Sequence, residues 1–378
     1  HLIISINHNI TIEMIKLENF FNFLKKREIS FFTGVPDSIL KEFSIYIEHK
    51  KIKHILATNE GSAVALATGY YLSNKKIPAI YLQNSGLGNA INPLISILHK
   101  KVYSIPSLLI IGWRGAPGLK DEPQHLTKGK ITKTLLKLAG IKYCIINDEK
   151  SFKELSNLLS YSKKNNVPVA CLIKKNTFIK NKKYFVKKNE NFRDLKRDYI
   201  IKELLKKVRN TKIISSTGYI SRELFRLSSN KQKKNNFYVV GGMGHCSMIA
   251  LGYSLFSKKQ VLCLDGDGSM LMHFGSIFTI GQQSKKNFKY ILLNNDSHES
   301  VGGQKTNLSK INLEKIIKEF KFEKYYLIKN KKDLNHKLNL FLASKKRSFL
   351  EIKMSSFNNN SLLGRPKDFI EIKKNFMK

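Results

Sequence analysis

The sequence has 378 residues, of which 42% are hydrophobic and 25% charged, the composition of a globular protein with two domains of ordinary size. No apolar run approaches the about 18 residues that a membrane-spanning helix needs. The apolar run at residues 2–6 is short and soon followed by polar residues, so we expect no secretory signal. The cysteines form no C-x-x-C pair and lie in apolar stretches, which predicts reduced, buried thiols in a cytoplasmic protein.

The formal net charge of +39 is typical of a protein that binds a polyanion such as a nucleic acid. However, 58 of the 67 basic residues are lysines, whereas nucleic-acid sites favour the planar donors of arginine. The lysines are also spread over the whole chain among many asparagines and isoleucines, as codon bias in an AT-rich genome would produce. We therefore expect no nucleic-acid partner, with a polyanion-binding surface as the alternative. In either case the charge would attract an anionic small molecule.

The first half of the chain alternates between helical and strand patterns. Apolar residues recur at helical spacing from Met14 to Glu28. Short apolar runs follow, separated by helical patterns, at residues 29–32, 54–57, 78–82, 107–112, 142–146 and 167–173. Short buried strands that alternate with helices predict a parallel sheet with helices on both faces.

The same alternation resumes in the second half, after a Lys- and Asn-rich stretch without periodicity. The predicted strands lie at residues 213–216, 237–240, 261–264, 290–293, 325–328 and 349–352. We predict two doubly wound α/β domains, residues 1–174 and 194–378, joined by a linker at 175–193. No sequence repeat relates the two halves, but they share one architecture. Ligands of such sheets bind at the carboxyl ends of strands, where both halves carry glycine and polar clusters.

The most informative motif is Gly266-Asp267-Gly268-Ser269, followed one helix and one strand later by Asn294-Asn295. Its glycines allow backbone N–H groups to approach a phosphate, and the helix that follows presents its positive N-terminus. A βαβ unit would bring Asn295 close to Asp267 at the ends of adjacent strands. The carboxylate, the amide oxygen and the main-chain carbonyl of Ser297 are hard ligands suited to a Mg²⁺ ion that bridges a diphosphate.

Other phosphate and metal motifs do not fit this segment. The sequence contains no G-x-G-x-x-G and no G-x-x-x-x-G-K-[ST] pattern. An EF-hand loop starting at Asp265 would need glycine and glutamate where Met270 and Ser276 stand. The remaining alternative is a plain structural turn.

With Gly-Asp-Gly followed by paired asparagines, the second half resembles the diphosphate-binding domain of the thiamine diphosphate enzymes. The resemblance implies that the first half is the pyrimidine-binding domain and contains a glutamate, for which Glu60 in Asn59-Glu60-Gly61-Ser62 is the candidate. Taken alone, Glu60 could equally compensate a helix dipole. The resemblance also implies a bulky apolar residue that holds the cofactor bent. Met243, between Gly242 and Gly244, occupies that position, and a core methionine is the alternative.

The resemblance covers roughly residues 14–378, and the middle domain of the long thiamine diphosphate decarboxylases is missing. The chain is similar to the short members of the family, which decarboxylate phosphonopyruvate or sulfopyruvate, in residues 31–38, 83–89, 112–125 and 298–304. Within these segments, the Lys120–His125 stretch and His298 resemble the phosphonate enzymes. Two features depart from the family pattern: Lys305, where proline is commoner, and Asp296-Ser297 after the paired asparagines.

This resemblance implies a carboxy-lyase that uses thiamine diphosphate and Mg²⁺ to convert 3-phosphonopyruvate to phosphonoacetaldehyde and CO₂, in phosphonate biosynthesis. The alternative on the same scaffold is a sulfopyruvate decarboxylase or another short 2-oxo acid decarboxylase. An alternative of a different class is a basic binding protein whose cofactor site has decayed, but intact Glu60, Asp267 and Asn295 argue against it. A homodimer or larger homo-oligomer with active sites at subunit interfaces is also implied.

The resemblance assigns roles to three sets of residues. The catalytic candidates are Glu60, which would hydrogen-bond the aminopyrimidine ring, and His125 and His298 as proton donors near neutral pH. The candidates that bind the cofactor are Glu60, Gly242, Met243, Gly266, Asp267, Gly268, Ser269 and Asn295, with Asp267, Asn295 and Ser297 as the metal ligands. The candidates that bind the substrate anions are Ser85, Arg114, Lys120 and Gln124. As isolated residues, the histidines, Arg114 and Lys120 would be ordinary surface or packing groups.

Overall fold

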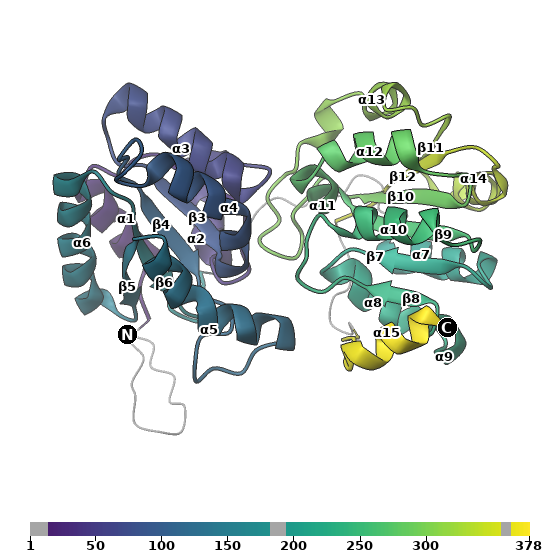
Figure 1. Cartoon of the computed structure of the whole chain (residues 1–378), viewed down its shortest axis with the longest axis horizontal. Helices are drawn as coiled ribbons and strands as arrows, with labels where there is room; N and C mark the ends of the chain where they lie inside the picture. Colours follow the sequence, from purple (N-terminus) through teal and green to yellow (C-terminus); the bar gives the residue numbers. More distant parts are fainter. Residues whose placement is uncertain (1–13, 182–193, 357–363) are drawn as a thin grey trace. The chain divides into compact units, whose positions relative to one another are not determined.

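A computed structural model of the chain describes residues 14–181, 194–356 and 364–378 (Figure 1). The chain divides into two compact units, His1–Val186 and Lys187–Lys378. Each unit contains one six-stranded sheet, and every pair of neighbouring strands in both sheets is parallel. The predicted fold class, two doubly wound α/β domains without a closed barrel, is therefore confirmed.

The first sheet has the strand order β2-β1-β3-β4-β6-β5. Its strands are β1 (Phe32–Gly34), β2 (His54–Leu56), β3 (Ala79–Gln83), β4 (Leu108–Gly112), β5 (Lys142–Ile146) and β6 (Val169–Ile173). Five of them overlap closely with the predicted runs, but β1 begins at the last residue of the run predicted at 29–32. The reason is that the Ile29 N–H bonds back to the Leu24 carbonyl at 3.0 Å, so this part of the run closes the preceding helix.

Helices cover both faces of the first sheet (Figure 1). One face packs against α1 (Leu17–Lys26), α2 (Lys41–His49) and α6 (Phe152–Asn165). The other packs against α3 (Glu60–Asn74), α4 (Leu87–Pro93) and α5 (Pro123–Leu138). Successive strand residues such as Tyr81 and Leu82 enter opposite cores, because side chains alternate along a strand. Fully buried strands of this kind read in the sequence as continuous apolar runs.

The second sheet has the strand order β11-β12-β10-β9-β7-β8. Its strands, all at the predicted places, are β7 (Lys212–Ser215), β8 (Asn236–Tyr238), β9 (Val261–Gly266), β10 (Phe288–Asn294), β11 (Lys324–Ile328) and β12 (Ser348–Lys353). One face packs against α7 (Arg197–Lys207), α8 (Tyr219–Leu227) and α14 (Lys331–Ala343). The other packs against α10 (Cys246–Leu255), α11 (Asp267–Met272), α12 (Gly275–Gln283) and α13 (Leu313–Glu319), with Phe376 of α15 (Phe369–Met377).

The two sheets have the same topology. When the strands of each unit are numbered from one to six along the chain, both orders read 2-1-3-4-6-5. The predicted shared architecture is thus present although the sequence shows no repeat. The direction of winding reverses between β1 and β3, and again between β7 and β9. Open α/β sheets bind ligands beyond the carboxyl ends of the strands at such points.

Part of the predicted linker packs on the first unit. Thr177 and Phe178 are buried, and Phe178 belongs to the core beneath α1 and α2. The other part, residues 182–193, lies outside the described residues, so the domain boundaries stay a prediction. The cysteines Cys144, Cys171, Cys246 and Cys263 are buried free thiols, as predicted. Within the described ranges, no helix is long and apolar enough to cross a membrane.

Candidate functional site

Asp267 lies directly after β9, at the first position of α11. The register pairs Gly266 with Leu293 of β10, so Asp267 and Asn295 leave the sheet at the same edge. The Asp267 side chain is buried, and its Oδ2 accepts hydrogen bonds from the Ser297 N–H at 3.0 Å and the Thr306 hydroxyl at 2.6 Å. The Ser297 N–H also lies 3.2 Å from Asn295 Oδ1. The structure therefore brings together the three residues that the sequence suggested as metal ligands.

The chemistry of this cluster fits a divalent cation. Burial raises the pKa of Asp267 to about 7, and the nearby Asp296 carboxylate contributes to the rise. A buried carboxylate that is costly to ionise on its own is stabilised when a cation compensates its charge. With the Asn295 amide and the Ser297 carbonyl, the donor set consists of oxygen atoms, which Mg²⁺ prefers.

The loop between Asn295 and Thr306 closes over the same edge of the sheet. Ser297 and Lys305 form an antiparallel bridge, and the His298 N–H donates to the Gln304 carbonyl at 2.8 Å. Asp296 takes the left-handed conformation, with φ at 54°. Its carboxylate accepts hydrogen bonds from the Ser309 hydroxyl at 2.7 Å and the Thr306 hydroxyl at 3.1 Å. This anchoring role accounts for the aspartate that departs from the family pattern.

Glycine fits position 268 because a larger residue there would displace the His298 ring. A Cβ atom on Gly268 would lie 2.8 Å from His298 Nδ1 and 3.6 Å from Met243 Cε. The Gly244 N–H donates to the Ser269 hydroxyl at 3.1 Å. The glycine loop that contains Gly242 and Met243 and the Gly-Asp-Gly motif are therefore neighbours, as the resemblance to thiamine diphosphate enzymes requires.

Glu60 is the corresponding acidic residue of the first unit. It is the first residue of α3, whose N-terminus is capped by the Asn59 side chain accepting from the Ser62 N–H at 2.8 Å. Glu60 is 5% exposed, and its Oε2 accepts a hydrogen bond from Asn89 Nδ2 at 2.8 Å. Burial raises its pKa, and the positive charge of Lys128 opposes this effect. A Cβ atom at Gly86 would lie 2.1 Å from Glu60 Oε1, so only glycine fits beside this carboxyl group.

Arg114 is held by protein partners on several sides. Its guanidinium forms a bidentate ion pair with Asp121, with Nε at 2.7 Å, and Nη1 donates to the Ser38 hydroxyl at 2.9 Å. The Asn84 side chain hydrogen-bonds both the N–H and the carbonyl of Arg114. The ion pair keeps the pKa of Asp121 well below its usual range, against the effect of its partial burial. The guanidinium is therefore fixed in orientation, and its charge is already balanced by Asp121.

The other candidate substrate residues have different environments. Lys120 is exposed. The Ser85 hydroxyl accepts from Gln83 Nε2 at 2.6 Å, and Gln124 Nε2 donates to Glu122 at 2.6 Å. Ser85 follows β3, whereas Lys120 and Gln124 lie in and after the loop that follows β4. Both strands end at the same edge of the first sheet.

Three buried polar atoms near this edge have no hydrogen-bond partner in the described part of the chain: His125 Nδ1, Gln124 Oε1 and Asp37 Oδ1. Asp37 is 1% exposed and lies against Gly112, where a Cβ atom would stand 1.8 Å from its Oδ2. Buried polar groups are normally satisfied, so unpaired ones point to a ligand or water that completes them. Asp37 and Ser38 lie in the segment 31–38 that resembles the short members of the family, but no pattern in the sequence predicts a role for them.

Burial changes the expected behaviour of the two candidate histidines. It lowers the pKa of His125 to about 4, with a further contribution from Arg114, and that of His298 to about 4. The resemblance predicts proton donors that titrate near neutral pH, whereas burial lowers both pKa values so far that the imidazoles are neutral there in the protein without ligands. A bound anion would raise both pKa values again.

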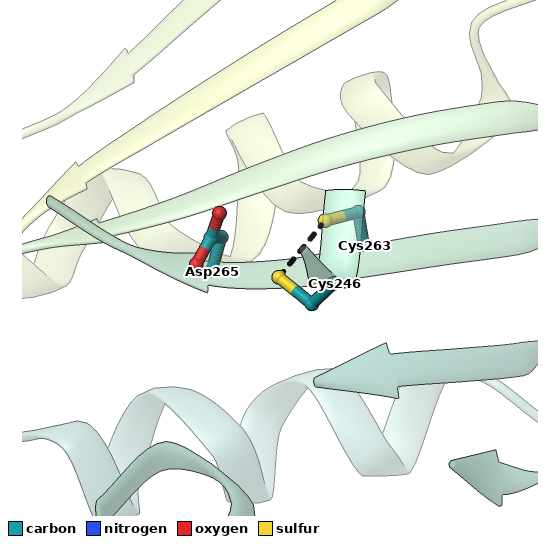
Figure 2. Close-up of side chains that lie close together, drawn as sticks. All are labelled: Cys246, Cys263 and Asp265. Carbon is teal, nitrogen blue, oxygen red and sulfur yellow. Dashed lines mark hydrogen bonds between the residues drawn. The ribbon is translucent and has the colours of Figure 1, made fainter. Parts of the chain in front are cut away.

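A separate polar cluster lies in the core of the second unit. Figure 2 shows Cys246 and Cys263, whose sulfur atoms are 3.9 Å apart, beside Asp265. Their ligand atoms lie within 4.8 Å of one another, but burial raises the pKa of all three groups, and metal binding needs thiolates. Asp265 already accepts hydrogen bonds from the Tyr290 hydroxyl at 2.7 Å and the Gly266 N–H at 2.8 Å. We interpret this cluster as packing beneath the site.

Comparison with known proteins agrees with this geometry. Residues 17–136 match the N-terminal TPP binding domain of thiamine pyrophosphate enzymes, and residues 216–352 match the C-terminal TPP binding domain. A phosphonopyruvate decarboxylase from Streptomyces viridochromogenes is 31% identical over 88% of this chain and 87% of its own. One from Streptomyces hygroscopicus is 29% identical over 88% and 86%. A sulfopyruvate decarboxylase from Methanosarcina acetivorans is 25% identical over 91% and 92%.

The chain belongs to the thiamine pyrophosphate enzymes, as its resemblance predicted. It is a thiamine diphosphate-dependent decarboxylase related to the phosphonopyruvate and sulfopyruvate decarboxylases.

Several residues of the site were not found from the sequence. The Thr306 hydroxyl donates to Asp267, which lies 39 positions earlier in the chain, and no local sequence pattern predicts this contact. Gln304 is the last residue of the segment 298–304 that resembles the family, and the sequence predicts no role for it. Its side chain is fully buried and neither of its amide atoms has a partner in the described part of the chain. Lys128, one helical turn after His125 on α5, contributes the positive charge near Glu60.

The variant Asp37→Asn tests how much the ionisation of buried Asp37, in the first unit, lowers the free energy of unfolding. Burial raises the pKa of Asp37 from 3.8 to about 6, so ionisation at neutral pH destabilises the fold, and this penalty vanishes below about pH 4. We expect the variant to raise the free energy of unfolding at pH 7.5 by up to about 3 kcal/mol, and the gain to disappear at pH 4. Urea unfolding followed by the fluorescence of Trp113, the only tryptophan, reports on the first unit.

Glu18→Gln, in the exposed first turn of α1, is the control and should leave the pH dependence unchanged. Parallel stability profiles of Asp37→Asn and the wild type between pH 4 and 8 would contradict the assignment of this cost to Asp37.

Proposed function

We propose that this decarboxylase acts on 3-phosphonopyruvate and forms phosphonoacetaldehyde and CO₂, with thiamine diphosphate and Mg²⁺ as cofactors. The observation that carries the proposal is the cluster of buried Asp267 and Asn295 with half-buried Ser297, beside the glycine loops. Two relatives at 31% and 29% identity, both named phosphonopyruvate decarboxylase, support the substrate. The proposal includes a cytoplasmic role in phosphonate biosynthesis.

In the second unit, the cluster would hold a metal ion and the diphosphate. Asp267, Asn295 and the Ser297 carbonyl would bind Mg²⁺, and the backbone around Gly266 and Gly268 would leave room for phosphate oxygens. Met243 would support the cofactor in its bent form. Thiamine diphosphate supplies the electron sink that makes loss of CO₂ from a 2-oxo acid feasible.

In the first unit, Glu60 would hydrogen-bond the ring nitrogen of the aminopyrimidine. Its buried position and raised pKa suit a carboxyl group that keeps a proton and shares it with a neutral ring. An exposed carboxylate at the start of a helix would instead be ionised at neutral pH.

Phosphonopyruvate carries a carboxylate and a phosphonate, so its site needs several donors or cations. We assign this role to Ser85, Arg114, Lys120 and Gln124. Arg114 would bind an anion through N–H groups in a fixed orientation, because Asp121 and Ser38 hold its guanidinium in place. His125 and His298 would serve as proton donors, since binding of the substrate anions raises their depressed pKa values.

A sulfopyruvate decarboxylase is the second candidate, supported by a relative with that name at 25% identity over 91% of this chain. A product assay with phosphonopyruvate, sulfopyruvate and pyruvate in parallel, with thiamine diphosphate and Mg²⁺ supplied, decides between them. Preferential turnover of phosphonopyruvate supports the proposal, and preferential turnover of either other acid contradicts it.

We also propose that the active form is at least a homodimer, because in this family the glutamate reaches a cofactor bound by another subunit. Sedimentation analysis combined with activity tests this assembly, and an active monomer would contradict it.

Asp267→Asn should abolish Mg²⁺-dependent binding of thiamine diphosphate. The variant keeps an oxygen that can accept from Ser297 and Thr306 but removes the charge that balances the cation. Isothermal titration calorimetry with and without Mg²⁺ measures the effect. Asp333→Asn, at a half-exposed position in the first turn of α14 where Asp333 pairs with Lys337, is the control and should bind as the wild type does. Wild-type cofactor affinity in Asp267→Asn would refute the metal site.

Glu60→Gln should retain most of the cofactor affinity but lower the rate of decarboxylation by about 10²–10⁴, because the amide cannot exchange a proton with the ring. NMR of the exchange of the cofactor's C2 proton in deuterated water isolates this step. Glu42→Gln, in the first turn of α2, is the control for a carboxylate that only compensates a helix dipole. If both variants exchange the proton as fast as the wild type, Glu60 has no role in activation.

A further inference from the structure

Arg197, the first residue of α7, is an almost fully buried cation, with 2% of its side chain exposed. Its Nε donates to Glu223 Oε2 at 2.6 Å, and its Nη1 donates to Glu299 Oε2 at 2.8 Å. Arg226 Nη2 donates to the other Glu223 oxygen at 3.0 Å. These two arginines and two glutamates form a chain of ion pairs, which we call the Arg197 network. It joins α7 and α8 to the loop after β10.

Stability alone does not explain the Arg197 network. Removing charges from water costs several kcal/mol per ion, and replacing a buried ion network by apolar residues of similar volume is often neutral or stabilising. Within the network, each glutamate is paired with at least one arginine. The informative question is which group outside the network it orients.

That group is Asn295, the proposed metal ligand. Its Nδ2 donates to Glu299 Oε2 at 3.0 Å, the same oxygen that accepts from Arg197. Its Oδ1 lies 3.2 Å from the Ser297 N–H, on the side of Asp267. If the amide turned over, its oxygen would face the Glu299 carboxylate and its N–H groups would face the Ser297 N–H. Both contacts are repulsive, because a carboxylate only accepts and an N–H only donates.

We propose that Arg197 is a positioning residue that acts through Glu299 to keep the amide oxygen of Asn295 turned toward the metal ion. The inference rests on the metal site of the proposed function. Arg197 fixes the position and charge of Glu299, and Glu299 then selects one of the two amide orientations. Partners that orient a metal ligand in this way typically contribute 10- to 100-fold in metal affinity, roughly.

The test measures metal affinity directly, by EPR of free Mn²⁺ during titration of the full-length protein with thiamine diphosphate present. Arg197→Met and Glu299→Leu should each weaken Mn²⁺ binding by about 10- to 100-fold. Glu299→Gln offers a side-chain oxygen that can accept from both Arg197 and Asn295, so it should recover most of the affinity lost in Glu299→Leu. Arg226→Met removes a charge at the far end of the network and should bind Mn²⁺ nearly as the wild type does.

Wild-type Mn²⁺ affinity in Arg197→Met and Glu299→Leu would overturn the inference, as would an equal loss in Arg226→Met. If Arg197→Met fails to fold, as judged by circular dichroism, the two Glu299 variants decide, and an equal loss in both contradicts the role. Failure of the proposed function looks different, because Asp267→Asn would then bind Mn²⁺ and cofactor normally. A loss in Asp267→Asn without one in Arg197→Met overturns only the inference.

Discussion

The cluster of Asp267, Asn295 and Ser297 in the second unit depends on the register between β9 and β10. Pairing of Gly266 with Leu293 places the residues after both strands at one edge of the sheet. A slip by one residue would turn the side chains of β10 to the opposite faces and exchange its two sets of core contacts. The register is fixed because Ile291 and Leu293 enter one core while Tyr290 and Leu292 enter the other. Core packing on both faces therefore sets the position of Asn295.

Both units contain a buried carboxyl group whose ionisation is costly, and both place it in the same structural position. Each places a buried carboxyl group, Glu60 or Asp267, at the first residue of a helix that follows a parallel strand. Burial raises the pKa of both groups, which leaves them receptive to a partner that supplies a proton acceptor or a positive charge. The positive end of each helix compensates part of the cost. Two sheets with identical strand orders thus each place a buried carboxyl group at the start of a helix.

Much of the fold could be predicted from the sequence because the central strands, such as β3, β4, β9 and β10, are buried on both faces and appear as continuous apolar runs. The site motifs were readable because Asp267 and Asn295 are separated by a single βαβ connection. Partners that are distant in the sequence could not be predicted: Arg197 and Glu299, for example, form an ion pair although 102 positions separate them. The ion pair of Arg114 could not be predicted either. Asp121 follows Arg114 by seven residues, but only the folded loop brings the two side chains into bidentate contact. The histidine pKa values depend on burial, which no local pattern reveals.

The raised pKa values of Glu60 and Asp267 have a consequence for the protein's lifetime in the cell. Burial makes ionisation of both carboxyl groups costly. If they hold the cofactor and the metal ion as proposed, the bound fold would be more stable than the cofactor-free fold, because a ligand that binds only the folded state stabilises it. Chains that lack cofactor unfold more often and are open to proteases for a larger share of the time. Under the proposed function, the cellular amount of this enzyme would therefore depend on the supply of thiamine, through turnover of the chains that lack cofactor.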